Sequence, residues 1–390
     1  SPMDFSVAKK DIMKLARRAQ AVADKKSTMP VLANVLLDAH DGIVTVSGTD
    51  LFLAVQGQAP ANVKRAGSVA VPAKDFFDRV SMMPEGPIRI VSDNGTNIVI
   101  RAASSARRYT LHGVPGKEFP RLPEAAEGAP TIALSADAMS VLIARTQFSI
   151  SPDDTRPNLN SALFEQQSEI VRMVTTDGHR LSKMEIASPA GATPVSLLLP
   201  LKAVAELKRL ADEARAETAK GAPATIEIFR SGSNAFFKVA QATFSVKLVD
   251  AQFPAYQQVI PQHSAHSARV PRAAFADALK AVSLAATSRT GGVRVNLSPG
   301  LLRITSESPE SGEGLDEVPM EYDGPEVTIG FNAKYFQGVL SAMDGEEDVI
   351  LEFSGELDPA VLRPGGTGEH AEHLAVVMPM RVDGQKGGAS

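Results

Sequence analysis

The stretch Thr175–Leu181, TTDGHRL, places an acid, a glycine, a histidine and an arginine side by side. Asp177 could orient His179, and His179 could then act as the general base of a hydrolase. A hydrolase also needs a nucleophile, and the sequence contains no G-x-S-x-G elbow to supply one. The segment therefore leaves two interpretations open: a hydrolase site, or a turn that exposes a histidine and an arginine.

Other kinds of chemistry are disfavoured by the composition. The 390 residues include no cysteine, which excludes disulfides and thiolate metal ligands. The sequence has no GxxxxGK[ST] phosphate loop and no acidic metal cluster. We therefore expect no metal or other cofactor, and no ATPase, nuclease or polymerase activity.

Length and hydropathy bound the class of protein. The chain is 44% hydrophobic with a formal net charge of −5, and its length suggests two or three domains. No apolar run reaches the roughly 20 residues of a membrane helix. No basic segment followed by an apolar one opens the sequence as a secretory signal would. We expect a soluble, cytoplasmic protein with no membrane contact.

The elements around TTDGHRL belong to a weak repeat that occurs three times. Each copy begins with a helical segment, expected at Ala8–Ala23, Ala136–Phe148 and Arg272–Ala286. The hydrophobic hairpins that follow are VLANVLLDAHDGIVTVSGTD, LNSALFEQQSEIVRMVTTDG and GVRVNLSPGLLRITSES. Second helices begin within VPAKDFFDRV, LPLKAVAELKRL and GFNAKYFQGVL, and more alternating strands close each copy. The repeat predicts α+β units of about 125 residues, an ordinary domain size, joined by linkers at Glu124–Pro130 and Pro261–Ala268.

The repeat bears on the catalytic interpretation. Thr176-Asp177 in the second copy corresponds to Thr49-Asp50 in the first, where Leu51-Phe52 follows instead of Gly178-His179. A residue pair shared by two copies indicates common architecture, and aspartate favours Asx-type bonding to its own backbone. We therefore expect a turn in preference to a catalytic pair.

Five of the six expected helices place cations opposite their apolar face on a helical wheel. The sixth, at Ala136, has only Arg145 near its outer face. The outward cations are Lys10, Lys14, Arg17, Lys74, Lys202, Arg209, Lys280 and Lys334. Such cations are compatible with an ordinary solvated surface, but their recurrence in an acidic chain favours a surface that meets phosphates. Without a zinc finger, an RNP-like motif or a tryptophan, DNA would be bound through its backbone, independent of sequence.

Four blocks together resemble one known family. They are TTDGHRL, KLVDAQFPAYQQVIP (247–261), IGFNAKYF (329–336) and VVMPMRV (376–382). In this order, and with STMPVLANVLL and VPAKDFF nearer the start, they resemble the bacterial sliding clamp, the β subunit of DNA polymerase III. The likeness extends from about Met3 to Val382.

The resemblance implies a DNA-clamp fold of three similar domains, each with two helices backed by antiparallel sheets, and head-to-tail pairing of two chains into a ring. The implied domains are 3–124, 131–261 and 268–382, with 383–390 as a flexible tail. The implied function is a non-enzymatic processivity factor that encircles duplex DNA and tethers the replicative DNA polymerase. An ATP-driven clamp loader, a separate protein, would open it, and the protein would associate with the nucleoid during replication. Lys25 and Lys26 join the implied DNA contacts.

The same resemblance implies a ring interface between unlike surfaces. The residues implied are Arg107, Arg108, Tyr109 and Leu111 on one chain, and Leu284, Glu307, Glu310 and Glu313 on the other. A charged edge strand that avoids aggregation is the alternative interpretation of ARRYTLHG (106–113).

Finally, the resemblance implies a cleft that binds short peptides of polymerases and other clients. The matching positions are Leu159, Thr176, Gly178, His179, Arg180, Leu181, Pro254, Gln258, Val259, Asn332, Tyr335, Val376, Met378, Pro379, Met380 and Arg381. Met378 and Met380 could adapt to several partners, while His179 and Arg180 would supply rim polarity without proton transfer. Gln258 stands where relatives can have arginine, and Thr290 where they can have an aromatic residue. These departures leave room for a specialised paralogue that evades an inhibitor or serves repair.

Overall fold

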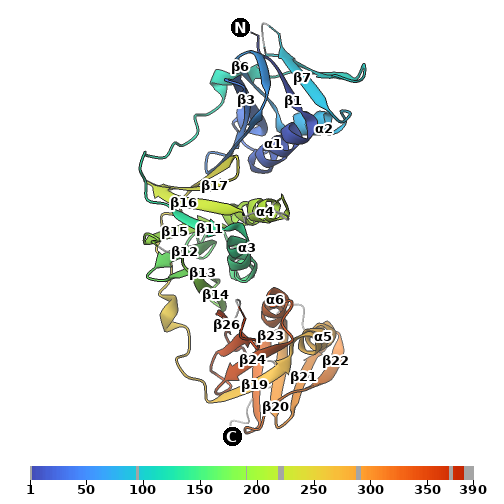
Figure 1. The fold of residues 1–390 in the computed structure, drawn as a ribbon. Helices are drawn as coiled ribbons and strands as arrows, with labels where there is room; N and C mark the ends of the chain where they lie inside the picture. The colour runs from blue at the N-terminus through green and yellow to red at the C-terminus, as the bar shows by residue number, and fades with distance from the viewer. Residues whose placement is uncertain are drawn as a thin grey trace. The chain divides into compact units, whose positions relative to one another are not determined.

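The computed structural model describes residues 2–93, 96–189, 191–217, 224–286, 291–368 and 372–381. The expected tail, 383–390, and Thr290 lie outside these residues. The chain forms two compact units, Ser1–Asp137 with Ala205–Leu248, and Ala138–Val204 with Val249–Ser390 (Figure 1). No helix among the described residues is long and apolar enough to span a membrane.

Helices occur where the repeat predicts them. Among the described residues they are α1 (Lys9–Val22), α2 (Ala73–Ser81), α3 (Ala136–Ala144), α4 (Leu201–Glu217), α5 (Arg272–Val282) and α6 (Ala333–Ala342). α3 and α5 end before the expected Phe148 and Ala286, because the chain tightens into the 3-10 turns η3 (Gln147–Ser149) and η5 (Ser283–Ala285). Short 3-10 turns of this kind are common at helix C-termini.

The first unit contains two antiparallel sheets. The strands are β1 (Asp4–Ala8), β2 (Asn34–His40), β3 (Ile43–Thr49), β4 (Leu53–Pro60), β5 (Asn62–Arg65), β6 (Gly67–Pro72), β7 (Pro87–Ser92), β8 (Ile98–Ala102), β9 (Arg108–Leu111), β10 (Val114–Pro115), β11 (Ile132–Ser135), β16 (Thr225–Ser231), β17 (Asn234–Val239) and β18 (Ala242–Lys247). One sheet has the order β5-β1-β7-β8-β9, and the other the order β10-β6-β2-β3-β4-β18-β17-β16-β11. Because β4 pairs with β18, strands of the first and second copies belong to one continuous sheet.

The second unit also contains two antiparallel sheets. The strands are β12 (Ser161–Gln167), β13 (Ile170–Thr176), β14 (Arg180–Ala187), β15 (Val195–Pro200), β19 (His266–Pro271), β20 (Gly292–Ser298), β21 (Leu301–Ser308), β22 (Gly312–Pro319), β23 (Val327–Asn332), β24 (Asp348–Phe353), β25 (Ala360–Pro364) and β26 (His373–Val377). Their orders are β15-β12-β13-β14-β26-β25-β24-β19 and β22-β21-β20-β23. β14 pairs with β26, so the strand that follows TTDGHRL's turn lies beside the last strand. β19 begins at His266, before the expected end of the linker at Ala268.

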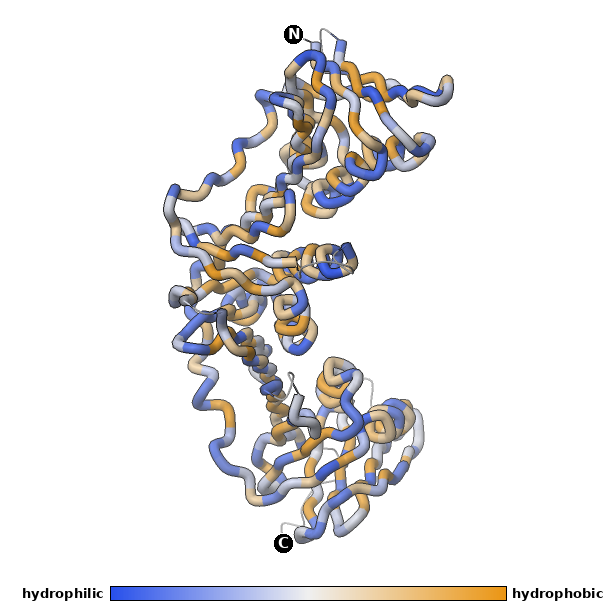
Figure 2. Tube along the Cα trace, viewed as in Figure 1, coloured by the Kyte–Doolittle hydropathy of each residue, from blue (hydrophilic) through white to orange (hydrophobic). Residues whose placement is uncertain are grey.

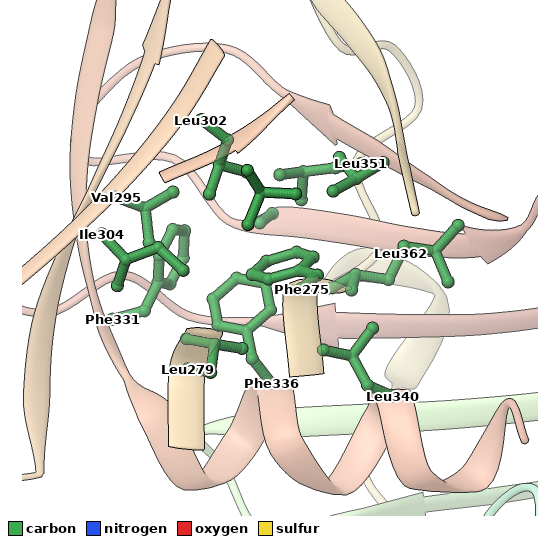
Figure 3. Packing of buried hydrophobic residues seen from close by; sticks show 14 of the residues in the cluster. Phe275, Leu279, Val295, Leu302, Ile304, Phe331, Phe336, Leu340, Leu351 and Leu362 are labelled. Carbon is green, nitrogen blue, oxygen red and sulfur yellow. The ribbon is translucent and has the colours of Figure 1, made fainter. Parts of the chain in front are cut away.

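In the third copy, the hydrophobic residues that predicted helices and strands are the ones buried in the core. Phe275 of α5, Phe336 of α6 and Phe331 of β23 converge between helices and strands (Figure 3). The Phe331 and Phe336 rings meet edge to face with centroids 4.6 Å apart. Hydrophobic residues alternate with hydrophilic ones along the strands (Figure 2), as expected where one face of a sheet is buried. Burying each such side chain contributes on the order of 2 kcal/mol.

Candidate functional site

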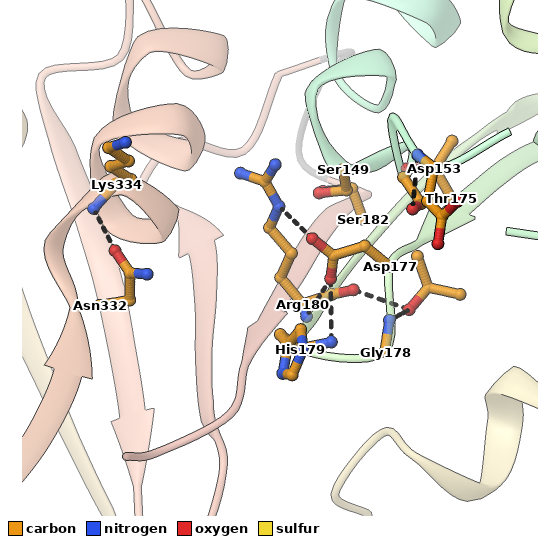
Figure 4. A network of polar contacts seen from close by, with 12 residues as sticks. Ser149, Asp153, Thr175, Asp177, Gly178, His179, Arg180, Ser182, Asn332 and Lys334 are labelled. Carbon is orange, nitrogen blue, oxygen red and sulfur yellow. Dashed lines mark hydrogen bonds and ion pairs between the residues drawn. The ribbon is translucent and has the colours of Figure 1, made fainter. Parts of the chain in front are cut away.

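The TTDGHRL segment folds into a tight turn between β13 and β14. The Thr176 hydroxyl donates to the Arg180 carbonyl at 2.7 Å and accepts from the Gly178 N–H. Asp177 Oδ1 accepts from the backbone N–H groups of His179 and Arg180 at 2.9 and 3.0 Å (Figure 4). Gly178 has a φ of 90°, a left-handed conformation that glycine adopts without strain.

The first copy contains the same turn between β3 and β4. Thr49 donates to the Leu53 carbonyl at 2.7 Å, and Asp50 Oδ1 accepts from the N–H groups of Phe52 and Leu53. Leu51 takes the place of Gly178 and has a φ of 77°. The prediction of a shared Asx-type turn is therefore confirmed.

This geometry does not assemble an acid–base pair. Asp177 uses Oδ1 for the backbone and Oδ2 for the Nε–H of Arg180, 3.2 Å away. Within the described part of the chain, none of its hydrogen bonds goes to the His179 ring. That ring instead stacks on Tyr335, with centroids 6.3 Å apart and an interplanar angle of 13°.

Arg180 joins the turn to α6. Its guanidinium lies 4.8 Å from the centroid of Tyr335 and 5.8 Å from that of Phe148, which lies in η3. Gly338 of α6 approaches so closely that a Cβ there would lie 2.9 Å from Phe148 Cδ2. Burial, together with the nearby Asp177 carboxylate, raises the pKa of Tyr335. Phe148 and Gly338 were not predicted as site residues, because neither lies in a sequence block that resembles the clamp family.

Beneath the turn lies a buried apolar layer. Leu181 and Val376 face each other across the β14–β26 pair and are almost inaccessible. Tyr256, from the 3-10 turn η4 (Tyr256–Gln258), belongs to the same cluster. The Tyr256 hydroxyl donates to Glu165 at 2.9 Å, and burial together with this bond raises the pKa of Tyr256 to about 12. Leu159 is buried as well.

Apolar side chains are also exposed above this layer. Val259 is 42% exposed and Met378 is 36% exposed. The terminal segment that carries Met378 is fixed by its backbone, since the Met378 N–H donates to the His179 carbonyl and the Met380 N–H to the Gly330 carbonyl. The other matching positions divide into half-buried and exposed ones: Pro254, Asn332, Pro379 and Met380 are half-buried, and Gln258 and Arg381 are exposed. We use the name cleft surface for His179, Tyr335, Val259 and Met378, the positions of the implied peptide cleft that carry accessible rings or apolar side chains.

Comparison with known proteins decides the family. The model of the N-terminal domain of the DNA polymerase III beta subunit matches residues 3–123, that of the central domain 133–255, and that of the C-terminal domain 257–381. The chain belongs to the DNA polymerase III beta subunit family.

Individual clamps agree with this assignment over their full length. The beta sliding clamp of Escherichia coli K12 is 30% identical over 381 residues, which are 97% of this chain and 100% of the relative. The DNA polymerase III subunit beta of Pseudomonas aeruginosa superposes with a TM-score of 0.89 at 28% identity, covering 97% of this chain and 100% of that one. A sliding clamp of Bartonella birtlesii bound to griselimycin gives 0.88 at 30% identity, covering 98% and 100%. The chain therefore has the three-domain clamp fold and is a sliding clamp, a non-catalytic subunit of DNA polymerase III.

The helices of this clamp expose most of the expected cations. Phe76 and Val80 are buried opposite Lys74, and Phe275 and Leu279 opposite Lys280, as the wheel predicted. The exposed cations are Lys10, Arg17, Lys25, Lys26, Lys74, Lys202, Lys280 and Lys334.

Three arginine and lysine positions differ from expectation. Lys14 is paired with Glu217. Arg209 is half-buried between Glu206 and Glu213, 3.2 and 3.3 Å away. Arg145 is buried, and its guanidinium lies 3.9 Å from Glu346, which is far away in the sequence. A helical wheel cannot show burial against a segment that is distant in the sequence.

The implied ring interface falls on the edges of two sheets. β9 is the edge strand of the five-stranded sheet, and β22 is the edge strand of the four-stranded sheet. Arg107 and Arg108 are exposed and Tyr109 is half-buried. Leu111, however, is only 5% exposed within the chain, because it faces the core beside Ile98, and it has little surface left for a partner.

The corresponding surface beside β22 is hollowed. A cavity of about 670 Å³ is lined by Leu284, Glu310 and Lys334 among others, and Leu284 is 83% exposed. A second cavity of about 440 Å³ is lined by Glu307, Glu313 and Leu315 among others. Leu315, also largely exposed, had not been identified, because it lies within the acidic run and carries no motif of its own.

Proposed function

We propose that this clamp encircles duplex DNA as a head-to-tail ring of two chains and tethers the replicative polymerase and other clients through the cleft surface. The observation that supports tethering most directly is the TTDGHRL turn. Its polar atoms are satisfied internally, while Val259 and Met378 expose apolar surface above a buried layer. Such a surface can bind an apolar anchor residue of a peptide, and this binding requires no proton transfer.

The proposal extends to the domains and the cellular setting. We assign domains near 3–124, 131–261 and 268–382, with the third taking in β19 from His266 because β19 pairs with β24. A clamp loader would open the ring, and the protein would act in the cytoplasm, on the nucleoid during replication. DNA contacts would come from the exposed helix cations and from Lys25 and Lys26, without sequence specificity.

Retention on DNA after loading tests the encirclement. The clamp is loaded onto nicked circular DNA, the sample is divided, and one half is linearised before gel filtration at raised salt. We expect the clamp to remain on the circle and to leave the linear molecule, because a topological link survives the loss of ionic contacts. Equal loss from both forms would contradict a ring.

A matched pair of variants tests the cleft surface. Met378→Asp places a charge where an apolar anchor should dock, whereas Leu357→Asp places the same charge on another exposed apolar residue of the same unit. We expect at least about tenfold weaker binding of a labelled client peptide to Met378→Asp in fluorescence anisotropy, equivalent to about 1.4 kcal/mol. Leu357→Asp should bind like the parent. Equal effects of the two variants would remove Met378 from the site.

A further inference from the structure

The exposed face of the five-stranded sheet carries a row of arginines. Arg89 of β7 lies directly opposite Arg101 of β8, and Arg101 lies directly opposite Arg108 of β9. Residues directly opposite each other on antiparallel strands project from the same face of the sheet. All three side chains are exposed, and they arise from neighbouring strands that are about 5 Å apart.

A buried carboxylate orients one end of this row. Asp4 of β1 accepts two hydrogen bonds from Arg89, at 3.0 and 2.7 Å, and lies 3.7 Å from Arg65 of β5. The hydrogen bond from Arg89 lowers the pKa of Asp4, so the carboxylate is ionised at neutral pH. Asp4 thus fixes the Arg89 head group and links it to Arg65, which lies opposite Asp4 in the adjacent row.

The remainder of the row is uncompensated. Within the described residues, the Arg101 and Arg108 side chains make no ion pair or hydrogen bond. Like charges directly opposite each other on a sheet are destabilising. The fold does not need this arrangement, because the sheet is held by its other face, where Ile90 and Ile100 are buried. In a chain with a net charge of −5, such a row is typical of a surface that binds an anion.

The other residues of this face indicate which anion. In the adjacent row of this face, Val91 lies opposite Val99, and Val99 lies opposite Thr110. They provide no aromatic ring, and single-stranded nucleic acids are usually held by stacking on such rings. They also provide no large exposed apolar anchor of the kind that centres a protein interface. Arginines without either feature match the phosphates of a duplex, which they can bind with two hydrogen bonds each.

We propose that Arg89 and Arg101 of this row, together with the neighbouring Arg65, form a second DNA-binding surface that holds the phosphate backbone of duplex DNA, whereas Arg108 on the edge strand belongs to the proposed ring interface. It is separate from the cations of α1 and α2, and it requires no passage of that duplex through a ring. A clamp with this surface holds a second duplex segment, or the flank of the same one, through contacts that are sensitive to salt and blind to sequence.

The test uses a small, covalently closed duplex circle without clamp loader, so that the DNA cannot enter a closed ring. Arg101→Gln removes one unpaired charge of the row, and Arg121→Gln removes an exposed arginine elsewhere in the same unit as a control. We expect Arg101→Gln to bind the circle severalfold more weakly in fluorescence anisotropy, with the slope of log affinity against log salt reduced by about one. Arg121→Gln should match the parent, and unchanged thermal unfolding of both variants would show that the fold is intact.

Three results would overturn the proposal. The first is parental affinity and salt slope for Arg101→Gln. The second is loss of circle binding in Lys10→Gln/Lys74→Gln but not in Arg101→Gln, which would assign the binding to the helices. The third is binding of polyglutamate, but not of the circle, that depends on Arg101, which would identify a protein-docking surface. None of these results affects retention of loaded clamp on circular DNA, so this proposal and the encirclement can fail separately.

Discussion

Leu51 and Gly178 occupy the same position in two copies of one turn, and both have a positive φ. A Cβ on Gly178 would meet no atom within 4 Å, so only the backbone conformation opposes a side chain there. Gly178→Ala should therefore lower the free energy of unfolding by about 1 kcal/mol. Leu51→Gly should change it by less, since relief of the same strain is offset by the freedom that glycine gains in the unfolded chain. Urea unfolding midpoints compare the two variants, and a larger loss from Leu51→Gly would contradict the strain argument.

Tyr256 gives the stability of the chain a specific dependence on alkaline pH. Its pKa is about 12 in the folded protein, against 10.0 ordinarily, because the phenol is buried and donates to Glu165. The folded state therefore keeps a proton that the unfolded state releases. Stability is fully present below pH 10 and is lost between about pH 10 and 12, by on the order of 2–3 kcal/mol in total.

Tyr256→Phe isolates this effect. The variant should show a shallower fall of the unfolding midpoint above pH 10, because every other titratable group is common to both proteins. Midpoints measured on either side of pH 10 make the comparison. Parallel curves for the two proteins would show that the Tyr256 phenol does not contribute.

Residue-scale prediction from the sequence succeeded where the causes are local. The Thr-Asp turn was predictable because its hydrogen bonds join residues at most four positions apart. Lys14 and Arg145 were misplaced because Glu217 and Glu346, which neutralise or approach them, are distant in the sequence. The stack of Arg180 on Tyr335 and Phe148 was unpredictable for the same reason.

At the scale of elements, periodicity fixed the helices and the hairpins but could not fix which strands become neighbours across copies. The β4–β18 and β14–β26 pairs join strands whose sequences show only alternation. Pairing of this kind depends on shape and packing between distant segments. The α1–α4 contact is a similar case, because Arg18 of α1 is buried against Glu213 of α4 at 3.0 Å.

The ion pair between Arg18 of α1 and Glu213 of α4 should contribute more to the free energy of unfolding than an exposed ion pair does. Glu213→Gln leaves the buried Arg18 without its carboxylate, and we expect a loss of about 2 kcal/mol, reduced from the 3–5 of a fully buried pair because Glu213 is partly exposed. The control is Asp78→Asn, which breaks the exposed Lys74–Asp78 pair and should lower the free energy of unfolding much less. Chemical unfolding of the two variants makes the comparison, and similar losses would refute a structural role for the α1–α4 pair.

At the scale of the whole molecule, two edge strands of opposite charge each have one side without a strand partner among the described residues. Arg108 begins β9 and Arg107 precedes it. Glu313 lies on β22, Glu310 lies in the turn before it, and Glu307 lies on β21 directly opposite Glu313. An exposed edge strand readily pairs with another chain, and unlike edges on one molecule generate a head-to-tail assembly. The exposed Leu284 and Leu315 add apolar surface beside the acidic edge.

Charge reversal at the basic edge should therefore open the ring. Arg107→Glu/Arg108→Glu places like charges against the acidic edge, and we expect the assembly to shift toward monomer in analytical ultracentrifugation, more strongly at low salt because screening then is weakest. Reversing the acidic edge as well, with Glu307, Glu310 and Glu313 all changed to Arg, should restore the dimer, which a general loss of folding could not do. An unchanged dimer in the first variant would remove β9 from the interface. Failure of the combined variant to recover would mean that the two edges do not face each other.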